Sequence, residues 1–159
     1  MKIFAIVGPS GSGKTRLLSQ LILELKKDGY EVAVIKHCAL GFQLDREGKD
    51  SQRLMESGSD GVALVAPERV AIFLRAENEV SLRKIAEDYF KNADFVLIEG
   101  GREEKTLKKI AIITEEAQEV LLPKEEELIA VVTKNKTNLS LPVFKPEEVK
   151  ELASFLENY

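Results

Sequence analysis

Eight residues near the N-terminus have the types and spacing of a phosphate-binding loop. The segment Gly8-Pro9-Ser10-Gly11-Ser12-Gly13-Lys14-Thr15 fits the pattern G-x-x-x-x-G-K-[ST] in full. Glycines at these positions let the backbone turn tightly and approach phosphate oxygens, so we expect the N–H groups of Gly11 to Thr15 to bind them. Ser10 and Ser12 place hydroxyls beside the same phosphates. The pattern also predicts that Lys14 reaches the β- and γ-phosphates and that the Thr15 hydroxyl ligates Mg²⁺.

The residues on either side predict the elements that must position this loop. Residues 3–7 form a continuous apolar run, which is typical of a strand buried on both faces of a parallel sheet. Residues 16–27 carry apolar side chains at i, i+3 and i+4 spacing, which indicates an amphipathic helix, and Asp28-Gly29 ends it. A strand at 31–36 completes a β-α-β unit, for which we expect a parallel pair and a right-handed crossover.

The rest of the chain continues the alternation of strands and helices. An antiparallel hairpin is expected over about 61–75, because two strand-like runs flank the short link Ala66-Pro67-Glu68. We therefore predict an α/β, three-layer P-loop NTPase fold, with a mostly parallel sheet and an antiparallel β-hairpin extension, in one nucleotide-binding domain over 1–159. The further helices are expected at 49–57, 81–91 and 146–159, and the further strands at 93–99, 109–113 and 128–132.

Two acidic residues are the candidates for metal binding and for catalysis. Glu99 follows four apolar residues and precedes two glycines, which places it at the carboxyl end of a buried strand. Ligands of open α/β sheets gather at that edge, so we expect Glu99 to serve the metal or to orient a water molecule. Asp45 lies in the polar segment after the second strand, where it is expected to approach the γ-phosphate and the metal, and Lys49 of the same segment is expected to contact the nucleotide.

Two further residues are expected to contact the nucleotide. His37 follows the second predicted strand, at the same sheet edge as the phosphate loop, and suits a contact with phosphate or an acid–base role. Asn135-Lys136 resembles the first half of the guanine-reading motif Asn-Lys-x-Asp, but Asn138 stands where that motif has its aspartate. Asn135 is therefore a base-reading candidate, and the choice between GTP and ATP stays open.

Composition narrows the functional classes. The 159 residues have a formal net charge of −4, which argues against a general nucleic-acid binder. One cysteine and one histidine exclude a Cys/His zinc cluster. The N-terminal apolar run is too short for a signal peptide, and no stretch reaches the length of a membrane span, so a cytoplasmic location is expected.

Several segments resemble the MobB family of molybdopterin-guanine dinucleotide biosynthesis proteins. They are Val32-Ala33-Val34-Ile35-Lys36-His37, Asp45, Gly48-Lys49-Asp50-Ser51 with Arg53, and Asp94 to Gly100. The resemblance implies a homodimer that binds GTP with Mg²⁺, hydrolyses it slowly at most, and assists a molybdopterin guanylyltransferase in attaching GMP to molybdopterin. It further implies that Thr15, Asp45 and Glu99 serve the metal. The hairpin Val62–Leu74 is the place where we expect the two protomers to join their sheets, since edge strands pair readily.

Two other functions use the same loop. A small-molecule kinase would carry a lid with arginines directed at the transferred phosphate, whereas the arginines of this chain are scattered along it. A metallochaperone-type GTPase would offer further Cys and His ligands beside His37 and Cys38. Both alternatives share the expectation that Lys14 is required for nucleotide binding.

Overall fold

The computed structural model describes residues 1–42, 50–76, 78–114 and 123–159. Its internal contacts divide the chain into two compact units. The first unit comprises Met1–His37 together with Ser81–Tyr159, and the second comprises Cys38–Val80. Each unit is described by itself below. The prediction of a single domain with an inserted hairpin stays a prediction.

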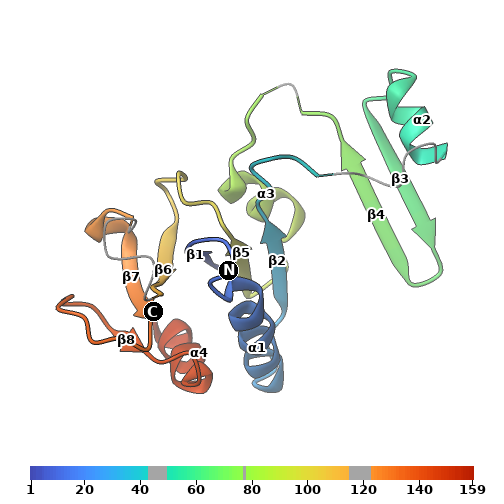
Figure 1. Cartoon of the computed structure of the whole chain (residues 1–159). Helices are drawn as coiled ribbons and strands as arrows, with labels where there is room; N and C mark the ends of the chain where they lie inside the picture. The colour runs from blue at the N-terminus through green and yellow to red at the C-terminus, as the bar shows by residue number, and fades with distance from the viewer. Residues whose placement is uncertain (43–49, 77, 115–122) are drawn as a thin grey trace. The chain divides into compact units, whose positions relative to one another are not determined.

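The first unit is built on a six-stranded sheet in which every pair of neighbouring strands is parallel (Figure 1). The strand order is β2-β5-β1-β6-β7-β8. Helices cover both faces of the sheet, so most side chains of the central strands are buried and apolar. Since the strands are parallel, their carboxyl ends meet at one edge of the sheet. The strands are β1 (Lys2–Val7), β2 (Val32–Lys36), β5 (Phe95–Glu99), β6 (Lys108–Ile112), β7 (Leu128–Val132) and β8 (Val143–Phe144).

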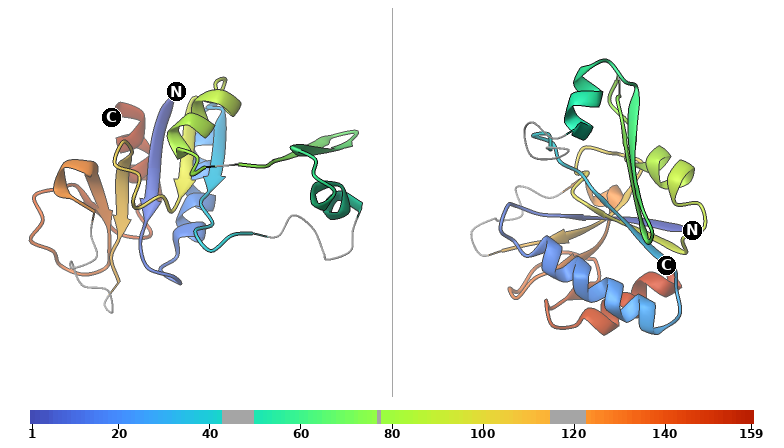
Figure 2. Two further views of the ribbon diagram at one scale, coloured as in Figure 1. Left: turned by 90° about the horizontal axis from the view of Figure 1, so that it is seen from above. Right: turned by 90° about the vertical axis from the view of Figure 1, so that its right-hand side faces the viewer.

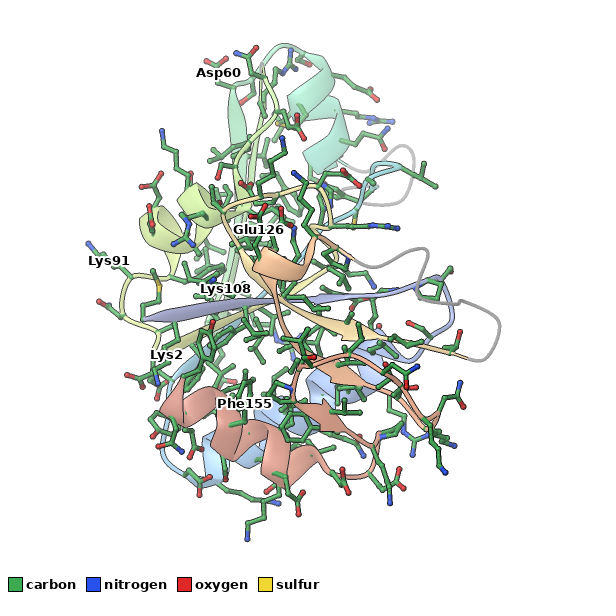
Figure 3. All side chains as sticks on the ribbon, turned by 90° about the vertical axis from the view of Figure 1, so that its left-hand side faces the viewer. Lys2, Asp60, Lys91, Lys108, Glu126 and Phe155 are labelled. Atoms are coloured by element: carbon green, nitrogen blue, oxygen red, sulfur yellow. The ribbon has the colours of Figure 1, made fainter. Side chains whose placement is uncertain are left out.

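Helices on both faces of the sheet make the three layers that the sequence predicts (Figure 2). One face is covered by α1 (Lys14–Lys27) and α4 (Val149–Asn158), whose buried leucines form a single core with the strands. Figure 3 shows Phe155 of α4 between that helix and the sheet, and its ring centroid lies 5.6 Å from that of Phe144 in β8. The other face is covered by α3 (Leu82–Tyr89), which buries Ala86.

The expected pairing of the first two strands is wrong. The structure places β5 between β1 and β2, and β5 pairs in parallel with both. The fully apolar run Phe95–Ile98 suits this position, because a strand with two neighbours and two covered faces has no solvent-exposed side. This order has a direct consequence for chemistry, because the register pairs Ile6 of β1 with Glu99 of β5 and so brings Glu99 next to the start of the phosphate loop.

The second unit contains the predicted antiparallel hairpin. Strands β3 (Gly61–Ala66) and β4 (Arg69–Leu74) pair along their whole length, and the short helix α2 (Asp50–Glu56) contacts β3. One face of the hairpin carries Val65, Val70, Ile72 and Leu74, which are 76%, 64%, 58% and 56% exposed, and we call these four residues the apolar hairpin face. Among the described residues of both units, no helix is long and apolar enough to cross a membrane.

The C-terminal helix begins later than the sequence predicts. The expected start at Pro146 is replaced by a turn, in which the backbone N–H of Lys145 donates to Glu148 Oε2 (2.8 Å) and the N–H of Glu148 donates to the carbonyl of Lys145 (3.0 Å). The turn delays the helix to Val149 and holds residues 145–148 at the carboxyl edge of the sheet, directly after β8.

Candidate functional site

The predicted phosphate loop lies between β1 and α1. Strand β1 ends at Val7 and α1 begins at Lys14, so residues 8–13 form the connection. Gly11 and Gly13 have φ angles of 75° and 89°, a left-handed conformation in which glycine alone is unstrained. The N–H groups at the start of α1 have no intrahelical acceptors, so they are available to an anion together with the positive end of the helix dipole.

The atoms around Gly8 leave no room for a side chain at this position. A Cβ atom at this position would lie 2.9 Å from Ser12 Oγ and 3.0 Å from the carbonyl oxygen of Ile112 in β6. Both distances are shorter than ordinary contacts, and the Ile112 oxygen belongs to the backbone, so it has little freedom to move. The first glycine of the motif therefore lets the loop pack against the neighbouring strand.

Two side chains of the loop show that it suits an anionic ligand. The Lys14 ammonium donates hydrogen bonds to the carbonyls of Gly8 (3.0 Å) and Pro9 (2.6 Å), which places its charge over the loop. Ser12 Oγ is buried and has no hydrogen-bond partner among the described residues. A buried hydroxyl without a partner is costly, and a phosphate oxygen is an acceptor of the kind it lacks.

The Thr15 hydroxyl and the Glu99 carboxylate lie together, as the motif reasoning predicts. Thr15 Oγ1 lies 3.0 Å from both Glu99 Oε1 and Glu99 Oε2, and the side chain of Glu99 is only 14% exposed. The Lys36 ammonium lies 3.7 Å from Glu99 Oε1. The neighbouring register of β1, β5 and β2 accounts for this cluster, because Lys36 and Glu99 end adjacent parallel strands and Thr15 lies in the first turn of the helix after β1.

This pair of oxygen ligands has the chemistry that Mg²⁺ requires. Magnesium is bound in nucleotide sites by one or two protein oxygens, while water and phosphate supply the remaining ligands. Thr15 and Glu99 offer a hydroxyl and a carboxylate of this kind. Among the described residues, no group of three or more His, Cys, Asp and Glu side chains gathers to hold a metal ion.

His37 lies beside this cluster through its backbone. Its N–H donates to the carbonyl of Glu99 (2.9 Å), and the side chain is exposed. Gly100 packs closely against it, since a Cβ on Gly100 would lie 3.4 Å from His37 Cβ. The structure therefore brings His37 to the predicted sheet edge. The other two predicted residues, Asp45 and Lys49, lie outside the described residues, and their assignments stay predictions.

A cleft of about 1110 Å³ extends from the phosphate loop along the same edge of the sheet. Asn135, the predicted base-reading residue, lines it and is half-buried, and its N–H donates to Thr133 Oγ1 (3.1 Å). The sequence reasoning missed other residues of the cleft, which come from α1, from the segment after β7 and from the turn before α4. These residues include Arg16, Gln20, Lys134, Pro146 and Glu147.

Comparison with known proteins agrees with this geometry. The family model for molybdopterin guanine dinucleotide synthesis protein B, MobB, matches residues 3–134. A molybdopterin-guanine dinucleotide biosynthesis adapter protein from Haemophilus influenzae is 37% identical over 158 residues, which cover 99% of this chain and 88% of the relative. A protein of the same description from Escherichia coli is 29% identical, with 97% and 90% covered.

Solved structures give the same result. A crystal structure described as molybdopterin-guanine biosynthesis protein B has a TM-score of 0.81 and 28% identity to this chain, with 98% of both chains covered. The Bacillus subtilis MobB crystal structure has a TM-score of 0.76 and 26% identity, with 97% of both covered. The chain therefore belongs to the MobB family, whose role lies in molybdopterin guanine dinucleotide biosynthesis.

Proposed function

We propose that the chain is a GTP-binding adapter, which uses Mg²⁺ and assists a guanylyltransferase in attaching GMP to molybdopterin. The observation that carries the nucleotide part of this proposal is the contact of Thr15 Oγ1 with both carboxylate oxygens of Glu99 at 3.0 Å. It joins the hydroxyl of the phosphate loop to the strand-end acid, and both are oxygen ligands of the kind that a Mg·nucleotide site uses. The adapter part rests on the family, and relatives are described as adapter proteins.

Each part of the proposed site has a physical task. The backbone N–H groups of Gly11 to Thr15 bind phosphate oxygens, and the Lys14 ammonium exchanges the loop carbonyls for the β- and γ-phosphates. Thr15 and Glu99 hold Mg²⁺, which, when bound, neutralises charge on the phosphate oxygens. Asp45 is assigned to the metal and the γ-phosphate, and Lys49 to the nucleotide.

Hydrolysis by the chain alone is expected to be slow. Catalysis of phosphoryl transfer needs a group that orients the attacking water and a cation that stabilises the transition state. Glu99 is the described acid nearest the loop hydroxyl, and it already accepts from Thr15 and lies near Lys36. The side chain of His37 is exposed to solvent. This arrangement suits a protein that holds a nucleotide more than one that turns it over rapidly.

The apolar hairpin face supports a homodimer in this proposal. Its four residues are more than half exposed, and the two-stranded sheet to which they belong has backbone edges that can pair with another strand. A second copy of the hairpin offers both an edge and an apolar face of the same kind. We further propose that the adapter acts in the cytoplasm, with the guanylyltransferase as its protein partner and no nucleic-acid partner.

The test compares GTP and ATP binding in the presence of Mg²⁺ for the wild type and Lys14→Ala. Lys14 is expected to donate two charge-assisted hydrogen bonds to the phosphates, each worth about 1.5–3 kcal/mol. Their loss in the variant predicts at least a roughly 100-fold weaker GTP affinity. Lys150→Ala, which removes an exposed lysine from α4, is the matched control and should bind like the wild type. A parallel assay measures whether wild-type chain with GTP increases dinucleotide formation by purified guanylyltransferase.

Three results would contradict the proposal. Unchanged GTP affinity in Lys14→Ala would remove the assigned phosphate site. Equal affinity of the wild type for GTP and ATP, with no effect on the guanylyltransferase, would contradict the adapter function. Rapid GTP turnover by the chain without any partner would contradict the assignment of a nucleotide holder.

A further inference from the structure

The cleft is lined in part by residues that no motif predicts, and a strand pairing brings one of them near Asn135. Strands β7 and β8 pair in parallel, with Val132 opposite Phe144, and the N–H of Thr133 donates to the carbonyl of Phe144 (2.9 Å). Asn135 and Glu147 each follow their paired strand residue by three positions, and both line the cleft. The two-residue strand β8 therefore brings a carboxylate from the C-terminal part of the chain to the same cleft as the predicted base-reading amide.

The turn before α4 leaves the Glu147 side chain available. Glu148 is used within the turn, because its carboxylate accepts from the N–H of Lys145. The Glu147 carboxylate has no hydrogen bond or ion pair to any residue that the structure describes. Asn138 stands where the Asn-Lys-x-Asp motif has its aspartate, but it is exposed and is not among the described residues that line the cleft.

The chemistry of a carboxylate in this place favours one kind of base. An ionised carboxylate only accepts hydrogen bonds. Guanine presents two adjacent donors, N1–H and the 2-amino group, which a carboxylate can accept together. Adenine presents an unprotonated N1 at the corresponding place, so its lone pair would face the negative charge. The Asn135 amide, which lines the same cleft, can supply a donor for the guanine O6.

We propose that Glu147 is the guanine-specificity residue of this chain and takes the place of the missing aspartate. Its carboxylate accepts from N1–H and the 2-amino group of the base, and the Pro146 ring beside it provides apolar surface for the base. This assignment rests on the proposed GTP binding and adds to it the residue that excludes ATP. A bidentate contact of this type discriminates between bases by about 10- to 100-fold.

The test measures Mg²⁺-dependent binding of four nucleotides to the full chain by calorimetry. The nucleotides are GTP, ITP, XTP and ATP, and the proteins are the wild type, Glu147→Gln and the matched control Glu151→Gln. Glu151 is exposed on α4 and is not among the described residues that line the cleft. Because Glu147 is exposed and its carboxylate has no hydrogen bond or ion pair to a described residue, Glu147→Gln should fold normally, which circular dichroism checks.

The expected results differ between the nucleotides. Wild-type chain should prefer GTP to ITP, since ITP lacks the 2-amino group. Glu147→Gln should lose about 10- to 100-fold in GTP affinity and no longer distinguish GTP from ITP. It should bind ATP at least as tightly as the wild type does, because the charge that faces adenine N1 is removed. It should gain affinity for XTP, whose 2-carbonyl oxygen can accept from the new amide. Glu151→Gln should match the wild type with all four ligands.

The outcomes separate this inference from the proposed function. Wild-type preference for GTP with an unchanged GTP-to-ITP ratio in Glu147→Gln would overturn the role of Glu147 and leave the GTP-binding proposal intact. A wild-type chain that binds ATP as well as GTP would overturn both. A uniform loss for all four nucleotides in Glu147→Gln would show a general effect on the cleft and would also overturn the assignment.

Discussion

Replacement of Lys109 tests how much a buried ion pair contributes to the stability of the first unit. Lys109 lies at the start of β6 and is 0% exposed. Its ammonium donates to the carbonyl of Arg102 (2.7 Å) and forms an ion pair with Glu127, whose side chain is 11% exposed. A buried cation of this kind stabilises the fold only while its partners satisfy it, so Lys109→Met should leave the Glu127 carboxylate without its counter-charge.

The expected cost follows from these contacts. Removal of one member of a buried ion pair costs about 3–5 kcal/mol, because the other charge stays buried without compensation. Replacement of both members by apolar side chains is often close to neutral. The double variant Lys109→Met/Glu127→Leu should therefore lose only the hydrogen bond to the Arg102 carbonyl, at about 1–3 kcal/mol. Each single variant should thus be less stable than the double variant.

Urea unfolding followed by circular dichroism measures these differences. With a slope of about 2 kcal/mol/M, a loss of about 4 kcal/mol lowers the midpoint by about 2 M. Lys108→Met is the matched control, because Lys108 is exposed and, within the part of the chain that the structure describes, its ammonium makes a single weak hydrogen bond, to the carbonyl of Glu126 (3.5 Å). Both residues are labelled in Figure 3. The control should stay within about 0.5 kcal/mol of the wild type. The reasoning is refuted if Lys109→Met costs no more than Lys108→Met, or if the two single losses simply add in the double variant.

Three further predictions concern the loop, a helix start and the hairpin. Gly8→Ala should weaken Mg·GTP binding by about 10- to 100-fold, because its Cβ would displace the loop from the Ile112 carbonyl at a cost of about 1–3 kcal/mol; wild-type affinity would contradict this. Ser81→Ala should lower the free energy of unfolding by about 0.5 kcal/mol, the low end for an N-cap, since Ser81 Oγ accepts from the N–H of Lys84 at 3.4 Å. Urea unfolding measures this loss, and a loss above about 2 kcal/mol would show that Ser81 does more than cap the helix. Ile72→Glu should convert the proposed dimer to monomers in sedimentation experiments, with Glu68→Lys in the hairpin turn as control, and dimers that persist would exclude the apolar hairpin face as the interface.

The parts of the fold that local patterns determine agree with the prediction. The phosphate loop needs glycines at fixed positions and a helix directly after it, and the sequence shows both. The hairpin and the Ser81 cap are likewise local features, since their partners lie within a few residues. Glu99 was predicted from an apolar run that ends in an acid and two glycines, and its proximity to Thr15 follows once that strand is central.

The strand order was not predictable in the same way. The apolar runs of β2 and β5 are similar in length and composition, so nothing local shows which of them pairs with β1. The buried position of Lys109 also depends on distant residues. A lysine before an apolar run usually lies at an exposed strand end, but the carbonyl of Arg102 and the carboxylate of Glu127 make burial tolerable here. Glu147 reaches the cleft through a strand of two residues, which is too short to produce a recognisable pattern.

The position of Glu99 depends on contacts from three other elements of the first unit. The Glu99 carbonyl accepts from the N–H of His37 after β2, and three residues later the Arg102 carbonyl accepts from Lys109 of β6. Glu104, at the end of the same turn, accepts from the N–H of Leu82 at the start of α3 (3.2 Å). The turn that follows the site acid is therefore held by β2, β6 and α3 without any contribution from a ligand. Since this turn need not be ordered on binding, its preorganisation favours retention of a Mg·nucleotide, which is the property that the proposed adapter requires.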